Sequence, residues 1–324
     1  MADMIRPVAP PNLPSLVQAA FNKARVTGDV TYYPTQVAVL TPRSIPVSIP
    51  VSIPFQLRFS PALAHKPKAP KPKEPNAKPF NPFENPSPAM LIADLPPSHR
   101  LVLNKFAVVP EHFILVTRDV KPQTHVLEKG DIAATFACIQ AYHADGRELF
   151  AFFNSGPHSG ASQPHRHLQL LPVERMKDGL EDVENGGQWR VLAEKLTEST
   201  QGLPFQVFTT GMRPDMSAEE RHSSYIELYR RAVEAALPDI EVSGEGEAKI
   251  SYNLAITSSS MALCPRTAEG TMIKNKSGES IGVVSLNGTV LAGTALVKNE
   301  AEWDALRENP DMLLDVLKGI GLPP

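Results

Sequence analysis

Three side chains at alternate positions, His165, His167 and Gln169, have the types and spacing that could do chemistry. Successive side chains of a β-strand point to opposite faces, so these three would share one face and Leu168 would lie on the other. A segment of Gly, Ala, Ser and Gln precedes them at residues 160–163. Its backbone N–H groups could bind an anion. The pattern therefore predicts a strand at an anion-binding site.

Covalent catalysis is one chemistry that these residues support. A neutral imidazole can attack phosphorus and form a covalent intermediate, and an unperturbed histidine is largely neutral at pH 7. The attacking nitrogen is free only if an acceptor holds the other ring nitrogen, and a backbone carbonyl near His165 could do this. Gln169 could donate an N–H to a phosphoryl oxygen, and donors placed in advance stabilise the charge that develops at phosphorus.

Two other interpretations of the same strand stay open on spacing alone. Two histidines at i and i+2 can share a metal, but a catalytic zinc site normally needs a third protein ligand. The other seven histidines show no paired spacing and no Cys-x-x-Cys occurs, so we predict no metal site. The three side chains could also form the exposed face of an ordinary half-buried strand. The loop before them is longer than a hairpin needs, which favours a functional site.

The segments around this strand predict a mixed α+β fold with mostly antiparallel pairing. We expect strands at residues 55–59, 112–117, 148–154, 165–171, 205–209, 251–257 and 261–265, and apolar core segments at 281–286 and 293–298. We expect helices at residues 12–24, 132–143, 188–199 and 217–236, with two short helices near the C-terminus. Asp131 is expected to cap the second helix, and Ser217 with Glu220 fits a capping box.

Proline is concentrated at the beginning of the chain, where the first 100 residues hold 20 of the 32 prolines. We therefore predict two parts. Residues 1–100 would be a helix and a proline- and lysine-rich extended region packed on a catalytic domain of residues 101–324. An Ile-Pro-Val-Ser repeat within residues 44–54 predicts an extended surface loop, to which we assign no function. The basic residues 64–73 predict a solvated linker in which Lys66 could contact a polyphosphate.

Composition argues against several classes of protein. The net charge of the 324 residues is −3, so no overall attraction to nucleic acid is expected. No apolar run approaches the roughly 18–20 residues of a membrane span, and no secretory signal is visible. Two cysteines, Cys138 and Cys264, do not form a disulfide framework and indicate a reducing compartment. We expect a monomer in the cytoplasm, with a location that can extend to the nucleus.

The segment at residues 159–169 resembles the His-x-His-x-Gln signature of the nucleotidyltransferase branch of the histidine triad superfamily. With Asn154 it is similar to the fungal diadenosine tetraphosphate phosphorylases, also called ATP adenylyltransferases. Residues 103–106, 108–113, 115–117, 251–254, 264–266 and 291–298 extend the resemblance over most of 55–322. It implies a histidine-triad-like antiparallel sheet flanked by helices, with a proline-rich N-terminal extension. The third triad position holds Gln169 and not His, which separates this branch from the simple hydrolases.

The resemblance also implies a role for individual residues. His167 would be the nucleophile that takes the adenylyl group, flanked by His165 and by Gln169, which would contact the transferred phosphate. The residues implied to bind substrate are Lys66, Asn104, Lys105, Asn154, Gly160, Ala161, Ser162, Gln163, Asn287, Gly288, Thr289, Thr294 and Lys298. No tightly bound cofactor is implied, and a divalent ion such as Mg²⁺ would travel with the substrate as a charge shield.

The activity implied by the resemblance is phosphorolysis of diadenosine tetraphosphate to ATP and ADP through an adenylyl-histidine on His167. The partners would be the dinucleoside polyphosphate, ATP, ADP and phosphate, without nucleic acid or membrane. One alternative is a hexose-1-phosphate nucleotidylyltransferase, which shares the covalent step but usually carries structural metal ligands that this sequence lacks. The other alternative is a non-catalytic nucleotide-binding module. The sequence does not fix the acceptor, which could be phosphate, sulfate or water.

Overall fold

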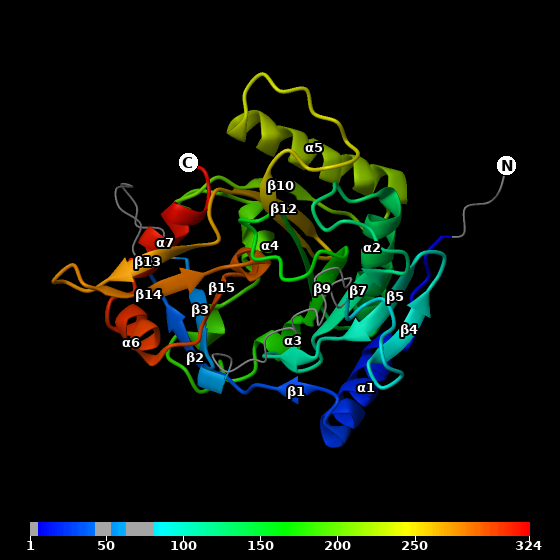
Figure 1. Cartoon of the computed structure of the whole chain (residues 1–324), viewed down its shortest axis with the longest axis horizontal. Coiled ribbons are helices and arrows are strands. Elements are labelled where there is room, and N and C mark those ends of the chain that lie inside the picture. The colour runs from blue at the N-terminus through cyan, green and yellow to red at the C-terminus, as the bar shows by residue number, and fades with distance from the viewer. Residues whose placement is uncertain (1–5, 43–52, 63–80) are drawn as a thin grey trace, which may run out of the picture.

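An eight-stranded sheet forms the centre of the computed structural model, which describes residues 6–42, 53–62 and 81–324. Every neighbouring pair in this sheet is antiparallel, which confirms the predicted α+β class (Figure 1). Its strands, in spatial order, are β10 (Phe208–Gly211), β12 (Ser260–Arg266), β11 (Ser251–Ile256), β8 (Leu149–Ser155), β9 (His167–Pro172), β7 (Phe113–Thr117), β5 (His99–Leu103) and β4 (Leu91–Leu95).

The alternation of side chains along each strand divides the hydrophobic core into two layers. Leu168 and Leu170 of β9 pack into the first layer, together with buried residues of α1 (Leu13–Thr27), α2 (Lys129–Ala144) and α5 (Ala218–Ala236). Leu171 packs into the second layer, beneath a three-stranded sheet of β15 (Thr294–Val297), β3 (Phe55–Phe59) and β2 (Gln36–Leu40). Since odd-numbered residues of β9 share a face, the predicted site faces the smaller sheet and not the three helices.

The remaining elements are short and connect these layers. They are the two-residue strands β1 (Thr31–Tyr32) and β6 (Phe106–Ala107), the hairpin of β13 (Gly270–Lys274) and β14 (Ser280–Ser285), the helices α3 (Val173–Met176), α4 (Leu192–Leu196), α6 (Glu300–Glu308) and α7 (Met312–Ile320), and the 3-10 turns η2 (Gly186–Gln188) and η3 (Gly288–Ala292). In the view of Figure 1, α6 and α7 lie with β2 and β3 to the left, and α1 and α2 lie to the right.

The helices predicted at residues 12–24, 132–143 and 217–236 are confirmed as α1, α2 and α5, but the predicted cap of α2 is not. The capping box of α5 forms, with Ser217 Oγ accepting the Glu220 N–H at 3.2 Å. At α2 the N-cap is Glu128, so the expectation that Asp131 caps the helix was wrong. Asp131 lies three residues inside, where one oxygen accepts the Glu128 N–H at 2.8 Å and the other accepts from the His99 ring.

Two segments after β9 differ from their predicted form. The helix expected over residues 188–199 is reduced to α4, because Trp189 is extended and buried and donates its Nε1–H to Gly293 O at 3.0 Å. The strand expected at 205–209 begins at Phe208 instead, because Phe205 packs inside the second core layer. Both shifts follow from burial of a large aromatic side chain, which overrides local preference.

Two predicted features lie outside the described residues. These are most of the Ile-Pro-Val-Ser repeat and the basic segment that contains Lys66. The division of the chain at residue 100 stays a prediction. Among the helices that the structure describes, none combines the length and apolar character of a membrane-spanning segment.

Candidate active site

Strand β9 carries the predicted site between two partner strands. His167 is paired with Val116 of β7, and Gln169 is paired with Phe152 of β8. His165 lies just before the strand, in an isolated bridge with Pro122. Only 1% of His165 and 3% of His167 is exposed, so both imidazoles are buried. The predicted common face therefore forms, and it is an interior face.

The His167 ring is held by the backbone two residues earlier. Its Nδ1 lies 2.7 Å from the carbonyl oxygen of His165. A carbonyl only accepts, so Nδ1 carries the proton and the lone pair of Nε2 is free. Burial lowers the pKa of His167 to about 4, although its hydrogen bond to the His165 carbonyl acts in the opposite direction. The ring is therefore neutral at pH 7, as a nucleophile requires.

The His165 ring uses both of its nitrogens within the protein. Its Nε2–H donates to Thr117 O at 2.9 Å, and its Nδ1 accepts from Asn81 Nδ2 at 3.0 Å. The orientation of the Asn81 amide is set by its Oδ1, which accepts the Phe83 N–H at 3.0 Å. Burial lowers the pKa of His165 as well. The His165 side chain is thus a neutral support for the segment, while its carbonyl holds His167.

Phe83 covers both rings. Its centroid lies 5.0 Å from that of His167 and 5.9 Å from that of His165. Residue spacing carries no signal for Phe83 or Asn81, because they lie more than 80 residues before the strand. Their contribution is to exclude water, and exclusion of water is what favours a neutral imidazole.

Gln169 is oriented by His112, which lies just before β7, and by Asn104, which directly follows β5. Its Oε1 accepts from His112 Nε2 at 2.7 Å and lies 3.5 Å from Asn104 Nδ2. The Asn104 amide is itself fixed, because its Oδ1 accepts the Phe106 N–H at 2.9 Å. Within the described residues, Gln169 Nε2 has no hydrogen-bond partner. Its N–H groups are therefore available to a phosphoryl oxygen.

The loop before β9 offers a run of free donors. In the described part of the chain, the backbone N–H groups of Gly160, Ala161, Ser162 and Gln163 bond no other group. Gly160 has φ +78°, and a Cβ placed there would lie 2.8 Å from the Cβ of Asn287. The loop therefore needs glycine at this position and lies directly against the 287–289 turn. Successive free N–H groups in such a loop suit an anion.

Asn154 connects that turn to the large sheet. Its Oδ1 accepts from Gly288 N and from Asn253 Nδ2, both at 2.9 Å. Asn287 in turn accepts the Thr289 N–H at 3.0 Å, which closes the turn. Since the oxygen of Asn154 is committed inside the protein, its Nδ2 is the group that remains for a phosphate.

The three lysines predicted to bind substrate are exposed or lie outside the described residues. Lys66 lies outside the described residues. Lys105 is exposed, with Nζ 5.9 Å from the ring centroid of Phe106, and Lys298 is also exposed. Thr294 is buried on the smaller sheet, where its Oγ1 lies 3.4 Å from Gln56 Oε1. Among residues 6–42, 53–62 and 81–324, no three His, Cys, Asp or Glu side chains form a metal-binding group.

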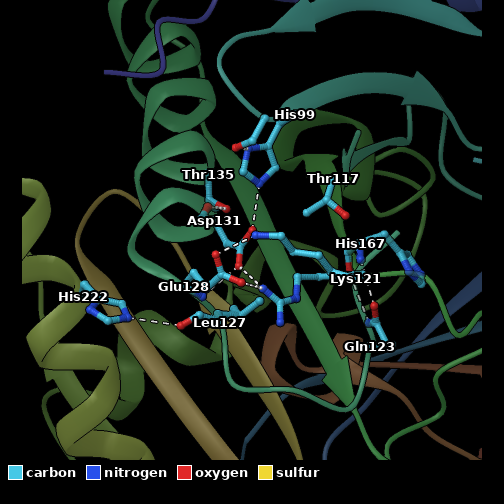
Figure 2. Close-up of polar contacts among 12 residues, drawn as sticks. His99, Thr117, Lys121, Gln123, Leu127, Glu128, Asp131, Thr135, His167 and His222 are labelled. Carbon is cyan, nitrogen blue, oxygen red and sulfur yellow. Dashed lines mark hydrogen bonds and ion pairs between the residues drawn. The ribbon is translucent and has the colours of Figure 1, made fainter. Parts of the chain in front are cut away.

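Gln123 contacts His167 although no sequence pattern pointed to it. Its Oε1 accepts the backbone N–H of His167 at 2.8 Å (Figure 2), and its Nε2 donates to Asn154 O at 2.8 Å. It lies between β7 and α2, and 44 residues separate it from His167. No spacing rule connects two such segments, so only the folded chain brings them together.

The opposite side of the strand carries an ion-pair network in which Arg166, Asp131 and His99 are buried. Arg166 Nη1 lies 2.9 Å from Asp131 Oδ2 and 2.9 Å from Glu128 Oε1. Asp131 Oδ1 lies 2.8 Å from His99 Nε2 (Figure 2). Burial would raise the pKa of Asp131, but the hydrogen bond from His99 and the charge of Arg166 outweigh it and bring the pKa below its ordinary value. The carboxylate is therefore ionised although it is buried.

Comparison with known proteins places the chain among enzymes of dinucleotide metabolism. Residues 4–183 match the model of the Ap4A phosphorylase N-terminal domain, and residues 201–323 match that of the ATP adenylyltransferase C-terminal domain. The chain is 29% identical over 279 residues to diadenosine 5',5'''-P1,P4-tetraphosphate phosphorylase 2 of Saccharomyces cerevisiae, covering 82% of each chain. It is also 29% identical over 235 residues to Protein APA1 of the same yeast, covering 70% of each.

Solved structures give the same fold. The crystal structure of yeast Ap4A phosphorylase Apa2 in complex with Ap4A superposes with a TM-score of 0.74 at 23% identity, covering 96% of this chain and 98% of that chain. The structure of the same yeast enzyme in complex with AMP gives a TM-score of 0.73 at 24% identity. The predicted histidine-triad-like sheet with flanking helices is thereby confirmed as the fold.

Proposed function

The chain belongs to the Ap4A phosphorylase family, whose N-terminal model alone matches residues 4–183, and on this premise we propose that it cleaves diadenosine tetraphosphate with phosphate to ATP and ADP. It would be a nucleotidyltransferase that forms a covalent adenylyl-histidine on His167. The observation that carries the proposal is the state of that ring, which is buried, neutral and held through Nδ1 by the His165 carbonyl. The yeast relatives that bear this activity in their names support the substrate.

In the first step, His167 Nε2 attacks the α-phosphorus of diadenosine tetraphosphate. The bond from that phosphorus to the oxygen shared with the β-phosphate breaks, and ATP leaves with the electron pair. The N–H groups of Gln169 and of residues 160–163, which bond no other group in the described part of the chain, are proposed to stabilise the charge that develops on the phosphoryl oxygens. No proton has to leave the attacking nitrogen, because Nε2 carries none.

In the second step, an oxygen of inorganic phosphate attacks the same phosphorus, the bond to Nε2 breaks and ADP forms. Two in-line displacements at one phosphorus retain its configuration. Asn154 Nδ2 and the 287–289 turn lie beside the loop and are proposed to hold the polyphosphate. Asn104 Nδ2 lies 3.5 Å from Gln169 Oε1, and Asn104 is therefore proposed to line the nucleotide pocket.

The charge of the polyphosphate needs compensation beyond neutral donors. We assign this to Lys66, Lys105 and Lys298, with Mg²⁺ bound mainly by the substrate and by water. Thr294 would contribute to the same site from the smaller sheet. A monomer located in the cytoplasm also belongs to the proposal. Its reducing compartment is supported by two cysteines, Cys138 and Cys264, that are free and buried.

The decisive experiment is product analysis with and without phosphate. Incubation with diadenosine tetraphosphate should give ATP and ADP only when phosphate is present. ATP and AMP without phosphate would instead show hydrolysis, and no turnover in either condition would refute the function. Repeating the assay with EDTA and with added Mg²⁺ tests the proposed role of the cation. Sulfate in place of phosphate tests how selective the acceptor position is.

A further inference from the structure

The pairing of β9 with β8 stops before His167, although His167 stays paired with β7 on its other side. Strands β8 and β9 are paired as far as Phe152 and Gln169, and there the pairing ends. Two further residues in the same register would place Asn154 opposite His167. Strand β8 nevertheless stays paired with β11 as far as Ser155, so β8 continues in the sheet after it has parted from β9. Backbone groups of Asn154 and His167 that would face each other therefore need other partners.

The amide of Gln123 supplies those partners. Its Oε1 accepts the His167 N–H at 2.8 Å, and its Nε2 donates to Asn154 O at 2.8 Å and to His167 O at 3.2 Å. Gln123 is only 3% exposed, so water does not replace it. One side chain thus connects the two residues proposed for nucleophilic attack and for phosphate binding, through their backbones.

The segment that carries Gln123 is fixed to the same stretch of chain. The Gln123 N–H donates to Pro164 O at 2.8 Å, and the Arg166 N–H donates to Lys121 O at 2.7 Å. Pro122 forms the antiparallel bridge to His165 between them. Residues 121–123 therefore replace β8 as the neighbour of this end of β9, and the position of Gln123 is set by backbone bonds on both sides.

We propose that Gln123 is a positioning residue for adenylyl transfer, which fixes the His167 backbone relative to Asn154 so that Nε2 is held in line with the scissile bond. This inference rests on the function proposed above. Reacting groups have to be held within a fraction of an ångström, and a misplacement of about 1 Å costs about 10²-fold in rate. An uncharged amide performs this task without placing a carboxylate beside an imidazole that has to stay neutral.

The test compares Gln123→Met with a matched control. Methionine is about as long as glutamine but makes none of the three hydrogen bonds. We expect the single-turnover rate of adenylyl-enzyme formation at saturating substrate to fall about 10²-fold, with less than about a threefold change in KM. The control is Tyr229→Phe on α5, which removes a partly buried hydrogen bond, 2.7 Å long, from the Lys249 N–H on the helix-covered side of the sheet. It should lower Tm by a few degrees without changing the rate.

A second variant, Gln123→Glu, gives a readout that a purely structural role would not produce. Protonated, its carboxyl group has an acceptor and an O–H donor in the places of the amide. Ionised, it turns only acceptors toward the carbonyls of Asn154 and His167. We therefore expect its rate to rise as the pH falls from about 8 to about 5.5, while that of the wild type stays constant.

The outcomes separate this inference from the function on which it rests. Wild-type protein without turnover refutes the proposed function. An active wild type together with a Gln123→Met rate equal to that of Tyr229→Phe refutes only the positioning role. If Gln123→Met does not fold, Gln123→Glu decides, because a pH profile parallel to that of the wild type would refute the same role.

Discussion

The two faces of strand β9 hold their polar side chains with opposite kinds of partner. On the face of His165 and His167, the hydrogen-bond partners within the described residues are backbone carbonyls, a hydroxyl and side-chain amides, all uncharged. On the other face, Arg166 is paired with the carboxylates of Glu128 and Asp131. Only one peptide unit separates the neutral arrangement from the charged one.

This difference shows how the fold keeps the buried His167, the proposed nucleophile, neutral. A carboxylate at hydrogen-bond distance from His167 would favour the imidazolium and remove the lone pair that attacks phosphorus. Because successive side chains point to opposite faces, Arg166 points away from the face of His167. The carboxylates of Glu128 and Asp131 pair with Arg166 on that other face. Buried charge pairs contribute little net stability, but they do fix geometry. We therefore infer that the charged face anchors the strand and that the neutral face carries the proposed chemistry.

The largest effect is expected from removing the nucleophile on the neutral face. His167→Ala should lower turnover by several orders of magnitude, because a missing nucleophile has no substitute. Affinity for diadenosine tetraphosphate should be retained, since the remaining donors are unchanged, and calorimetric titration would measure it. Turnover close to that of the wild type would mean that the chain binds nucleotide without using His167.

Breaking the charged face should mainly affect stability. Arg166→Met leaves the Asp131 carboxylate buried without its cationic partner, which costs about 3–5 kcal/mol of unfolding free energy. Urea denaturation of the variant would measure this change. The rate per folded molecule should fall far less than in His167→Ala. An unfolding free energy equal to that of the wild type would show that the anchor is dispensable.

Removing the donor on the neutral face should affect rate and not stability. Gln169→Ala deletes an N–H donor proposed for the transferred phosphate, and loss of one such donor costs about 10²–10³-fold in kcat. His112→Phe is the matching test of orientation, because it removes the hydrogen bond from His112 Nε2 to Gln169 Oε1, together with the approach of Asn104 Nδ2 to the same ring. Its rate should lie between those of the wild type and Gln169→Ala. Unchanged kcat in both variants would contradict the role of Gln169.

The pH dependence of the single-turnover rate tests the neutral face directly, because the rate depends on the protonation state of His167. Since burial lowers the pKa of His167 to about 4, its nucleophilic form persists as the pH falls. The single-turnover rate should stay level from about pH 8 to pH 5 and decline near pH 4, whereas an ordinary histidine would lose activity near pH 6.5. Between about pH 6.5 and pH 4, the His167 imidazole binds a proton in the unfolded chain but not in the folded chain. The free energy of unfolding should therefore decrease as the pH falls through this range.

The smallest effect is expected at the outer edge of the charged network. Lys121 Nζ lies 2.6 Å from Glu128 Oε2, but the carboxylate side chain is 55% exposed. Lys121→Ala should therefore change the unfolding free energy by less than about 1 kcal/mol. Urea denaturation of Lys121→Ala alongside Arg166→Met controls for the loss of one positive charge. A loss as large as that of Arg166→Met would show that the network acts as one unit.

Much of the fold could be predicted because it depends on local patterns. Helix α5 follows from its capping box and periodicity, and the β11–β12 hairpin follows from two strand-like runs around a serine turn. The alternation of His165, His167 and Gln169 fixed their common face before any contact was known. The expectation of a backbone carbonyl near His165 was also confirmed, since the acceptor lies only two residues from the ring that it holds. The substrate-binding roles stay predictions.

The sequence by itself thus determined which side chains share the functional face, since a strand alternates with period two wherever it is placed. Tertiary structure decided what surrounds them. Gln123, His112 and Asn81 reach β9 from 44, 57 and 84 residues away. Asp131, which resembled a helix cap, pairs with Arg166 for the same reason. Sheet register and the packing of segments distant in sequence select these partners, and no local spacing encodes that selection.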